Sequence, residues 1–66
     1  MKIKLNGKEE TIESGLTVEG LLKRFSIGAD AIAVEINREI VPKRTHAAVI
    51  LNDGDKVEIV KMVGGG

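Results

Sequence analysis

The residues of this chain best suited to chemistry stand at its end, where the glycines Gly64, Gly65 and Gly66 follow the last apolar stretch. Glycine has no side chain and loses the most conformational freedom on ordering, so such a run at a terminus predicts a thin, mobile peptide. A peptide of this kind can enter a narrow channel and present a free carboxylate. We therefore expect Gly66 to carry the reactive group, with residues 64–66 as a flexible tail on a domain of residues 1–63.

A terminal carboxylate cannot react unaided. Its pKa of about 3.3 to 3.7 makes it an anion at neutral pH and a poor electrophile. The chain has no cysteine, which removes thiol nucleophiles, thiolate metal sites and disulfides. His46 is the single histidine and has no second ligand at a metal-binding spacing, so we expect a surface residue, no metal site and no catalytic residue. Activation of the carboxylate must then come from a partner protein.

Apolar residues next to the glycines suggest where a partner could dock. The last strand alternates until Val60, Met62 and Val63 break its pattern. If Val57 and Ile59 face the interior, Val60 and Met62 face the open side of the sheet, close to the tail. We weigh two interpretations: a small docking patch for the partner enzymes, or a residue that caps the core beside an ordinary exposed apolar one.

Two further patterns give weaker signals. Gly15 and Gly20 have the glycine spacing of a phosphate-binding loop, but Leu21 stands where that loop requires lysine, so we expect a turn and a helix glycine. A basic cluster of Arg38, Lys43 and Arg44 is interpreted as a solvated face; the alternative is that it meets acidic residues of a partner.

Composition limits the classes of function. A chain of 66 residues forms one domain, and its ten basic and ten acidic residues leave no net charge. Bulk charge therefore gives no reason to expect nucleic acid or an anionic membrane as a partner. No stretch approaches the roughly 18 apolar residues of a membrane span. We expect a soluble, cytoplasmic protein.

The first half of the chain predicts a hairpin and a helix. Asn6-Gly7 favours a type I′ turn after a short alternating strand, and the polar return strand over residues 8–13 suits a sheet edge. Thr17 is a good N-cap for a helix with one apolar stripe, and Gly28 is expected to stop it.

The second half predicts further strands. The clearest spans residues 31–37, and residues 38–42 form a tight turn and a short strand ended by proline. An irregular connection over 43–51 and a turn at 52–55 lead to a last strand over 56–63.

These elements predict an α+β protein in which a mixed sheet of four or five strands is packed across one face by one main helix. A crossover connection allows the first and last strands to lie parallel at the centre, which is the ubiquitin-like β-grasp arrangement. The expected inward side chains are Ile3, Leu5, Ile12, Val18, Leu21, Leu22, Phe25, Ile32, Val34, Ile36, Leu51, Val57 and Ile59.

The order of these motifs resembles the ThiS family of sulfur carriers in thiamine biosynthesis. The similarity covers the whole chain: the Asn6-Gly7 hairpin, the helix start at Thr17, the strand over 33–37, the Asp53-Gly54-Asp55 turn and the glycine ending. His46 lies in a loop where relatives often place a large aromatic residue, which is a departure from the family pattern.

The resemblance implies a function for the tail. An E1-like adenylating enzyme would activate the Gly66 carboxylate with ATP, and conversion to a thiocarboxylate would prepare sulfur for thiazole synthase. A sulfur donor system such as a cysteine desulfurase would supply the sulfur. The carrier itself would be no enzyme and would hold no bound cofactor.

Other functions share part of this evidence. Sulfur carriers for molybdopterin or tRNA thiolation and ubiquitin-like modifiers use the same tail chemistry, so the tail alone does not separate them. From a different class, TGS-type β-grasp modules bind RNA or protein without a free carboxylate. The single aromatic residue, Phe25, and the balanced charge disfavour the nucleic-acid alternative.

Overall fold

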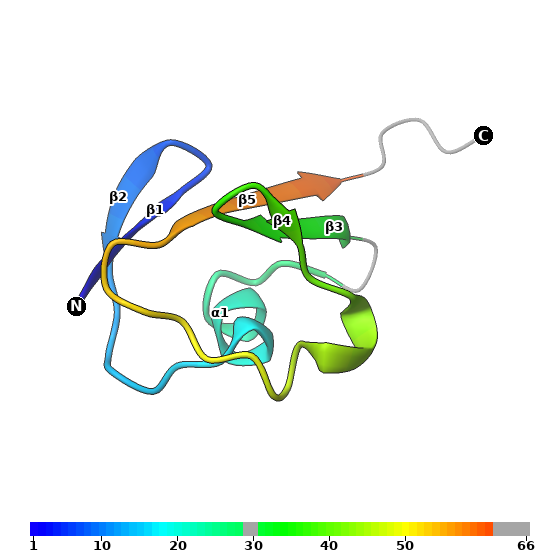
Figure 1. Ribbon diagram of the computed structural model, residues 1–66, viewed down its shortest axis with the longest axis horizontal. Helices are drawn as coiled ribbons and strands as arrows, with labels where there is room; N and C mark the ends of the chain where they lie inside the picture. The colour runs from blue at the N-terminus through cyan, green and yellow to red at the C-terminus, as the bar shows by residue number, and fades with distance from the viewer. Residues whose placement is uncertain (29–30, 62–66) are drawn as a thin grey trace.

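A computed structural model describes residues 1–28 and 31–61, with the backbone alone at 31, 32 and 61. The elements follow the order β1 (Lys2–Leu5), β2 (Lys8–Thr11), α1 (Val18–Arg24), β3 (Ala31–Ile36), β4 (Glu39–Ile40), the 3-10 helix η1 (Lys43–Thr45) and β5 (Lys56–Lys61). The five strands form one mixed sheet in the order β2-β1-β5-β3-β4, and α1 lies on one face of it (Figure 1).

The centre of the sheet confirms the predicted crossover. β1 and β5 are parallel neighbours, whereas β1–β2, β3–β4 and β3–β5 are antiparallel. The polar strand β2 lies at one edge, as its composition predicts, and β4 lies at the other. The α+β, ubiquitin-like β-grasp prediction is therefore correct.

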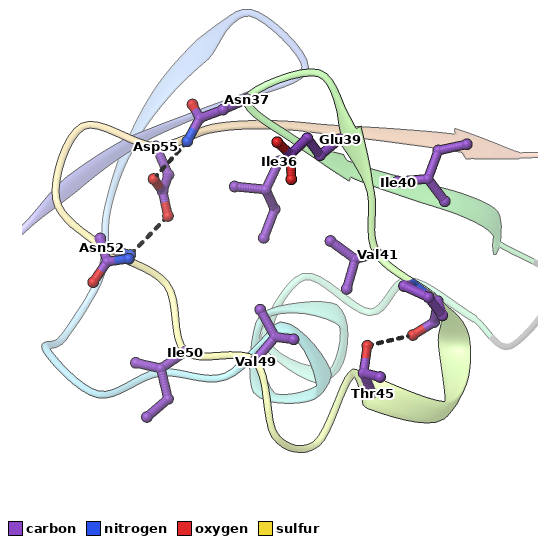
Figure 2. Close-up of a pocket in the computed structure, with 11 residues that line it drawn as sticks. Ile36, Asn37, Glu39, Ile40, Val41, Thr45, Val49, Ile50, Asn52 and Asp55 are labelled. Carbon is purple, nitrogen blue, oxygen red and sulfur yellow. Dashed lines mark hydrogen bonds between the residues drawn. The ribbon is translucent and has the colours of Figure 1, made fainter.

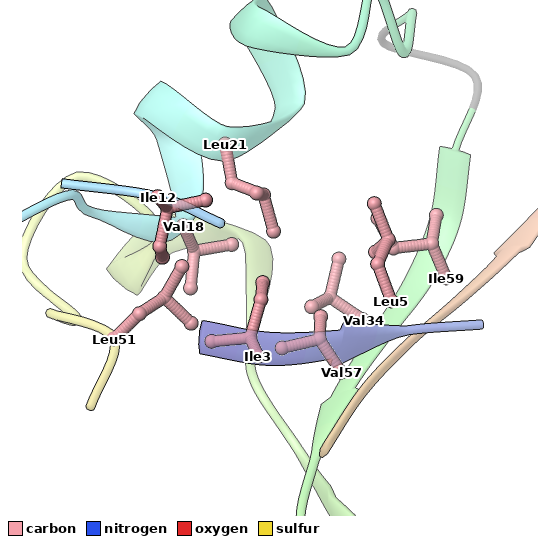
Figure 3. Close-up of a cluster of buried hydrophobic side chains, with 9 residues drawn as sticks. All are labelled: Ile3, Leu5, Ile12, Val18, Leu21, Val34, Leu51, Val57 and Ile59. Atoms are coloured by element: carbon pink, nitrogen blue, oxygen red, sulfur yellow. The ribbon is translucent and has the colours of Figure 1, made fainter. Parts of the chain in front are cut away.

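The core lies between the sheet and α1 (Figure 3). Its buried apolar side chains are Ile3, Leu5, Ile12, Val18, Leu21, Val34, Leu51, Val57 and Ile59. Three other members of the predicted inward set, Leu22, Phe25 and Ile36, are half-buried and pack against this cluster. The side chain of Ile32 lies outside the described part of the structure.

The helix begins where it was predicted to begin and ends earlier. Thr17 caps α1, and its Oγ1 accepts a hydrogen bond of 3.0 Å from the backbone N–H of Gly20. The helix ends at Arg24, and Ser26 then takes a left-handed conformation with φ of 55°. The expectation that Gly28 stops the helix is wrong, because Ser26 supplies the change of direction two residues sooner.

Strand ends also differ from the prediction. β2 stops at Thr11, although Ile12 still forms two 2.8 Å hydrogen bonds with Met1. β3 stops at Ile36, because Asn37 has a positive φ of 51° and belongs to the following turn. The predicted irregular connection contains the short helix η1.

Candidate functional site: the open sheet face at the end of β5

The predicted reactive tail begins beyond the described part of β5. Met62, Val63, Gly64, Gly65 and Gly66 lie outside the described residues, so the roles assigned to them remain predictions. What the structure does describe is the strand that leads to them and the surface beside it.

β5 is held on both sides. It pairs with β1 at Lys56 and Val57, and with β3 from Val57 to Lys61. After β1 ends, the side chain of Asn6 continues the contact: its Oδ1 accepts a hydrogen bond of 2.7 Å from the backbone N–H of Ile59. Opposite the last residues of β5, β3 shifts register between Ala31 and Ala33, an irregularity that bends a strand and increases its twist.

Val60 lies on the sheet face opposite α1. Val57 and Ile59 are buried, whereas Val60, the residue after Ile59, is 47% exposed, which confirms the predicted alternation up to this residue. Its partner across β3 is Ala33. The two side chains make a small apolar row on the open face just before the end of the described strand.

The next row of the open face is acidic. Glu58 on β5 lies directly opposite Glu35 on β3, and like charges facing each other across two strands oppose pairing. Arg38 and Lys56 line a shallow hollow of about 400 Å³ with this pair. The face beside Val60 therefore combines a small apolar row with charges of both signs.

The predicted basic cluster is divided in the fold. Arg38 lies in the turn before β4, whereas Lys43 and Arg44 lie in η1 after it (Figure 1). The turn and η1 stand at the two ends of β4. The three side chains therefore belong to separate parts of the surface.

His46 connects loops. Its ring Nε2 lies 3.1 Å from the carbonyl oxygen of Val41, and its own carbonyl accepts a hydrogen bond of 3.0 Å from the backbone N–H of Glu19. The second bond satisfies a free donor in the first turn of α1. His46 thus joins the β4–η1 segment to the start of the helix.

The two glycines with phosphate-loop spacing have structural roles. Gly15 has φ of 88°, which favours glycine in a turn. Gly20 lies in α1, where a Cβ atom would stand 2.7 Å from Cδ1 of Leu16. The interpretation as a turn and a helix glycine is confirmed.

Sequence reasoning missed a buried acidic residue. Asp55 is 8% exposed, and its carboxylate accepts hydrogen bonds from Nδ2 of Asn37 at 3.0 Å and from the backbone N–H of Asn52 at 2.8 Å. Its position in an Asn-Asp-Gly-Asp run signals a turn but not burial. The signal that would identify it is the partner Asn37, which lies 18 positions earlier.

Within 1–28 and 31–61, no group of three or more metal-binding side chains is brought together. Over the same residues, no helix has the length and apolar character needed to cross a membrane.

Comparison with known proteins places this fold in a family. The model of the ThiS family matches residues 3–66. The sulfur carrier protein ThiS of Bacillus subtilis is 37% identical over 65 residues, which cover 97% of this chain and 98% of that protein. The crystal structure of the thiamine biosynthesis protein ThiS from Geobacter metallireducens covers 100% of both chains, with 33% identity and a TM-score of 0.85.

One similar protein is much longer. A thiazole synthase of Paramagnetospirillum magneticum is 48% identical over 66 residues, which are 100% of this chain and 20% of that protein. The chain thus spans about a fifth of the length of this relative. With the family model matched over almost the whole chain and the β-grasp sheet shared with a solved relative, this chain belongs to the ThiS family.

Proposed function

We propose that this protein is a sulfur carrier of thiamine biosynthesis whose Gly66 carboxylate is converted to a thiocarboxylate. The observation that supports this most strongly is the ThiS family match, which runs through residue 66 and so includes the glycines. The similarity to the Bacillus subtilis sulfur carrier, which extends over 97% of this chain, supports the same role.

Activation requires ATP and an adenylating enzyme of the E1 type. A carboxylate oxygen of Gly66 attacks the α-phosphorus of ATP, which forms an acyl adenylate and releases pyrophosphate. The terminal sulfur of a persulfide, formed by a donor such as a cysteine desulfurase, then attacks the acyl carbon and displaces AMP. A thiol of the donor system cleaves the resulting acyl disulfide, supplies the two electrons and ends as a disulfide. The product is a C-terminal thiocarboxylate, and no electrons are gained or lost by the carbon.

The carrier contributes delivery. The sequence contains no cysteine, so no thiol of this chain can form a thioester with its own terminus. Three extended residues reach roughly 10 Å, enough to bring Gly66 into a recessed site while the folded domain stays outside. In this proposal the partner enzymes perform the chemistry and this protein is their substrate.

Val60, Met62 and Val63 form the proposed docking patch for these enzymes. The exposure of Val60 on the open face supports its part in the patch. We expect Val60→Asp and Met62→Asp to fold normally and to weaken binding to the adenylating enzyme. Unchanged binding by both variants would remove the patch from the proposal.

The decisive experiment is deletion of Gly66. Because the core lies within residues 3–59, the shortened protein should unfold at the same urea concentration as the wild type. It should form no adenylate when the purified adenylating enzyme and ATP are assayed by pyrophosphate exchange. The deleted form still ends in a carboxylate, on Gly65, but one residue short; Gly66→Ala keeps the full length of the tail and serves as the matched control, with reduced but measurable exchange.

Intact mass tests the product itself. Protein isolated from its native host under thiamine starvation should carry a terminal thiocarboxylate, which selective alkylation distinguishes from methionine oxidation of nearly equal mass. Normal adenylation of the deleted form, or no thiocarboxylate with active partner enzymes present, would contradict the proposal.

A further inference from the structure

A second apolar surface lies at the edge of the sheet, away from Val60. A groove of about 450 Å³ opens between β4 and residues 49–52, and we name it the β4 groove (Figure 2). Its floor consists of the half-buried side chains of Ile36, Val41 and Val49. At its rim, Ile50 is 55% exposed. Ile40 is 69% exposed and pairs with Glu35, so its side chain lies on the open face, on the other side of the same sheet edge (Figure 2). An aliphatic groove with further exposed aliphatic side chains along the same sheet edge indicates a surface that binds an apolar group.

The polar atoms at both ends of the groove already have partners. At one end, the Asp55 carboxylate accepts from Asn37 and from the backbone of Asn52. At the other, the Thr45 hydroxyl donates to the carbonyl oxygen of Pro42 at 2.7 Å (Figure 2). These groups are engaged and the floor of the groove is aliphatic, so the groove suits a hydrocarbon side chain.

The charge of the lining has one sign. Glu39 and Asp55 are its charged residues, and both are acidic. Asp55 is buried and engaged in hydrogen bonds, whereas Glu39 is exposed. A ligand that enters the groove therefore meets the Glu39 carboxylate, which forms no ion pair with the described side chains. A lysine or arginine beside the aliphatic group would complement it.

The backbone of β4 favours an extended ligand. Ile36 pairs with Glu39 around a two-residue turn, and the N–H of Val41 bonds to the carbonyl of Val34 at 2.8 Å. In an antiparallel pair these positions alternate, so the N–H and C=O of Ile40 point away from β3, toward the outer edge. An extended segment can pair there and direct a side chain into the groove.

We propose that the β4 groove docks an extended segment of thiazole synthase, which inserts one aliphatic side chain over Val41 and Val49 and places a lysine or arginine beside Glu39. The proposal rests on the proposed function. The long relative supports the choice of partner: it carries a region 48% identical to this whole chain within one protein named thiazole synthase. Two domains kept in one chain remain close together and can maintain a docking contact outside the active site.

The test is calorimetric titration of the purified thiazole synthase with this protein. Ile40→Asp and Ile50→Asp should each raise the Kd at least about tenfold, because each places a charge against the docked segment, Ile50→Asp at the groove rim and Ile40→Asp on the other face of the β4 edge. Glu39→Lys should raise it about threefold or more, with a smaller salt dependence. Thr11→Asp adds the same charge to an exposed site on β2, at the opposite sheet edge, and should leave the Kd within about twofold.

The outcomes separate this proposal from the proposed function. Binding to the synthase needs no adenylation. If the wild type is never adenylated but binds the synthase, and Ile40→Asp weakens that binding, only the proposed sulfur-carrier function is contradicted. The groove proposal is overturned if both isoleucine variants bind the synthase as tightly as the wild type does. It is also overturned if the wild type does not bind the synthase. Self-association abolished by the two variants, with synthase binding unchanged, would assign the groove to a second copy and also overturn it.

Discussion

The two hairpins of the sheet, β1–β2 and β3–β4, hold β5 between them in nearly the same way. Each has a two-residue turn that begins with asparagine, Asn6 in the first and Asn37 in the second, and both asparagines have positive φ angles of 50° and 51°. Each asparagine donates its backbone N–H to a β5 carbonyl at 2.8 Å. Each also accepts a β5 amide through its side-chain oxygen, at 2.7 Å and 3.1 Å.

The hairpins differ in the second turn residue. Gly7 adopts φ of 84° in the first turn, where glycine has no steric penalty. Arg38 adopts φ of 72° in the second, and an L-residue with a Cβ atom loses about 1–2 kcal/mol there. The second turn is also bound to buried Asp55 through Asn37. The comparison teaches that local turn chemistry specifies the first hairpin, whereas a distant carboxylate maintains the second.

The largest expected loss of stability comes from removing the Asp55 carboxylate, which holds the second hairpin through Asn37. Asp55→Ala should lower the free energy of unfolding by about 2–3 kcal/mol, since it leaves the Asn37 amide and the Asn52 N–H without their acceptor. Urea denaturation measures the change. Asp53→Ala is the control, because exposed Asp53 accepts one hydrogen bond from Lys2, and its loss should be about 1 kcal/mol or less. Equal losses would remove the special role of Asp55.

The next test compares the asparagines directly. Glycine at either position keeps the positive φ and removes the side-chain bonds. Asn37→Gly should cost about 2 kcal/mol, because Asn37 bonds both Asp55 and Lys56, and Asn6→Gly about 1 kcal/mol. Asn6→Asp retains an acceptor for Ile59 and should recover most of the smaller loss. A larger loss at Asn6 would reverse the comparison.

A smaller effect of opposite sign is expected at the second turn residue. Arg38→Gly should stabilise the protein by about 0.5–1 kcal/mol, because relief of the left-handed strain exceeds the added entropy of the unfolded chain. Gly7→Ala should destabilise the first hairpin by about 1 kcal/mol for the converse reason. Thermal unfolding of both variants measures the difference, and a destabilised Arg38→Gly would show that the arginine side chain contributes more than its strain costs.

The smallest effect lies outside both hairpins and provides a baseline. Glu13 pairs with Arg24, and its pKa lies below the ordinary value of 4.5 because its backbone amide and then the Arg24 side chain stabilise the carboxylate. This stabilisation is present above pH 4.5 and is lost as pH falls through the lowered pKa. Arg24→Gln should make unfolding slightly less sensitive to pH on the acid side. Because both side chains are exposed, their ion pair contributes little to stability. The differences in unfolding free energy between the hairpin variants should therefore be the same with and without Arg24→Gln.

The parts of the fold that were predicted correctly from the sequence depend mostly on interactions between residues close together in the chain. Asn6-Gly7 predicted the first turn and Thr17 the helix start, because each acts within a few residues. Asn37 was expected to end a strand and Asp55 to be an ordinary turn residue, since neither shows its partner 18 positions away. Ile40 and Ile50 come from a two-residue strand and a loop, where no periodicity marks a shared surface.

Of the predicted functional residues, Val60 was correctly placed on the open face, because the alternation of β5 determines it. The tail residues and Met62 remain predictions. The division of the basic cluster could not be foreseen, because closeness in sequence does not indicate closeness in space when a strand runs between the residues.

The central position of β5 has a consequence for synthesis on the ribosome. β1 and β3 both use β5 as a neighbour, and the bond from Ile59 to Asn6 spans 53 positions. While β5 is still inside the ribosome, β1 and β3 therefore each have one edge whose backbone groups lack their β5 partner. Such edges pair readily with other chains. The nascent domain is therefore prone to aggregation until β5, Lys56–Lys61, has left the ribosomal tunnel and fills the gap between β1 and β3.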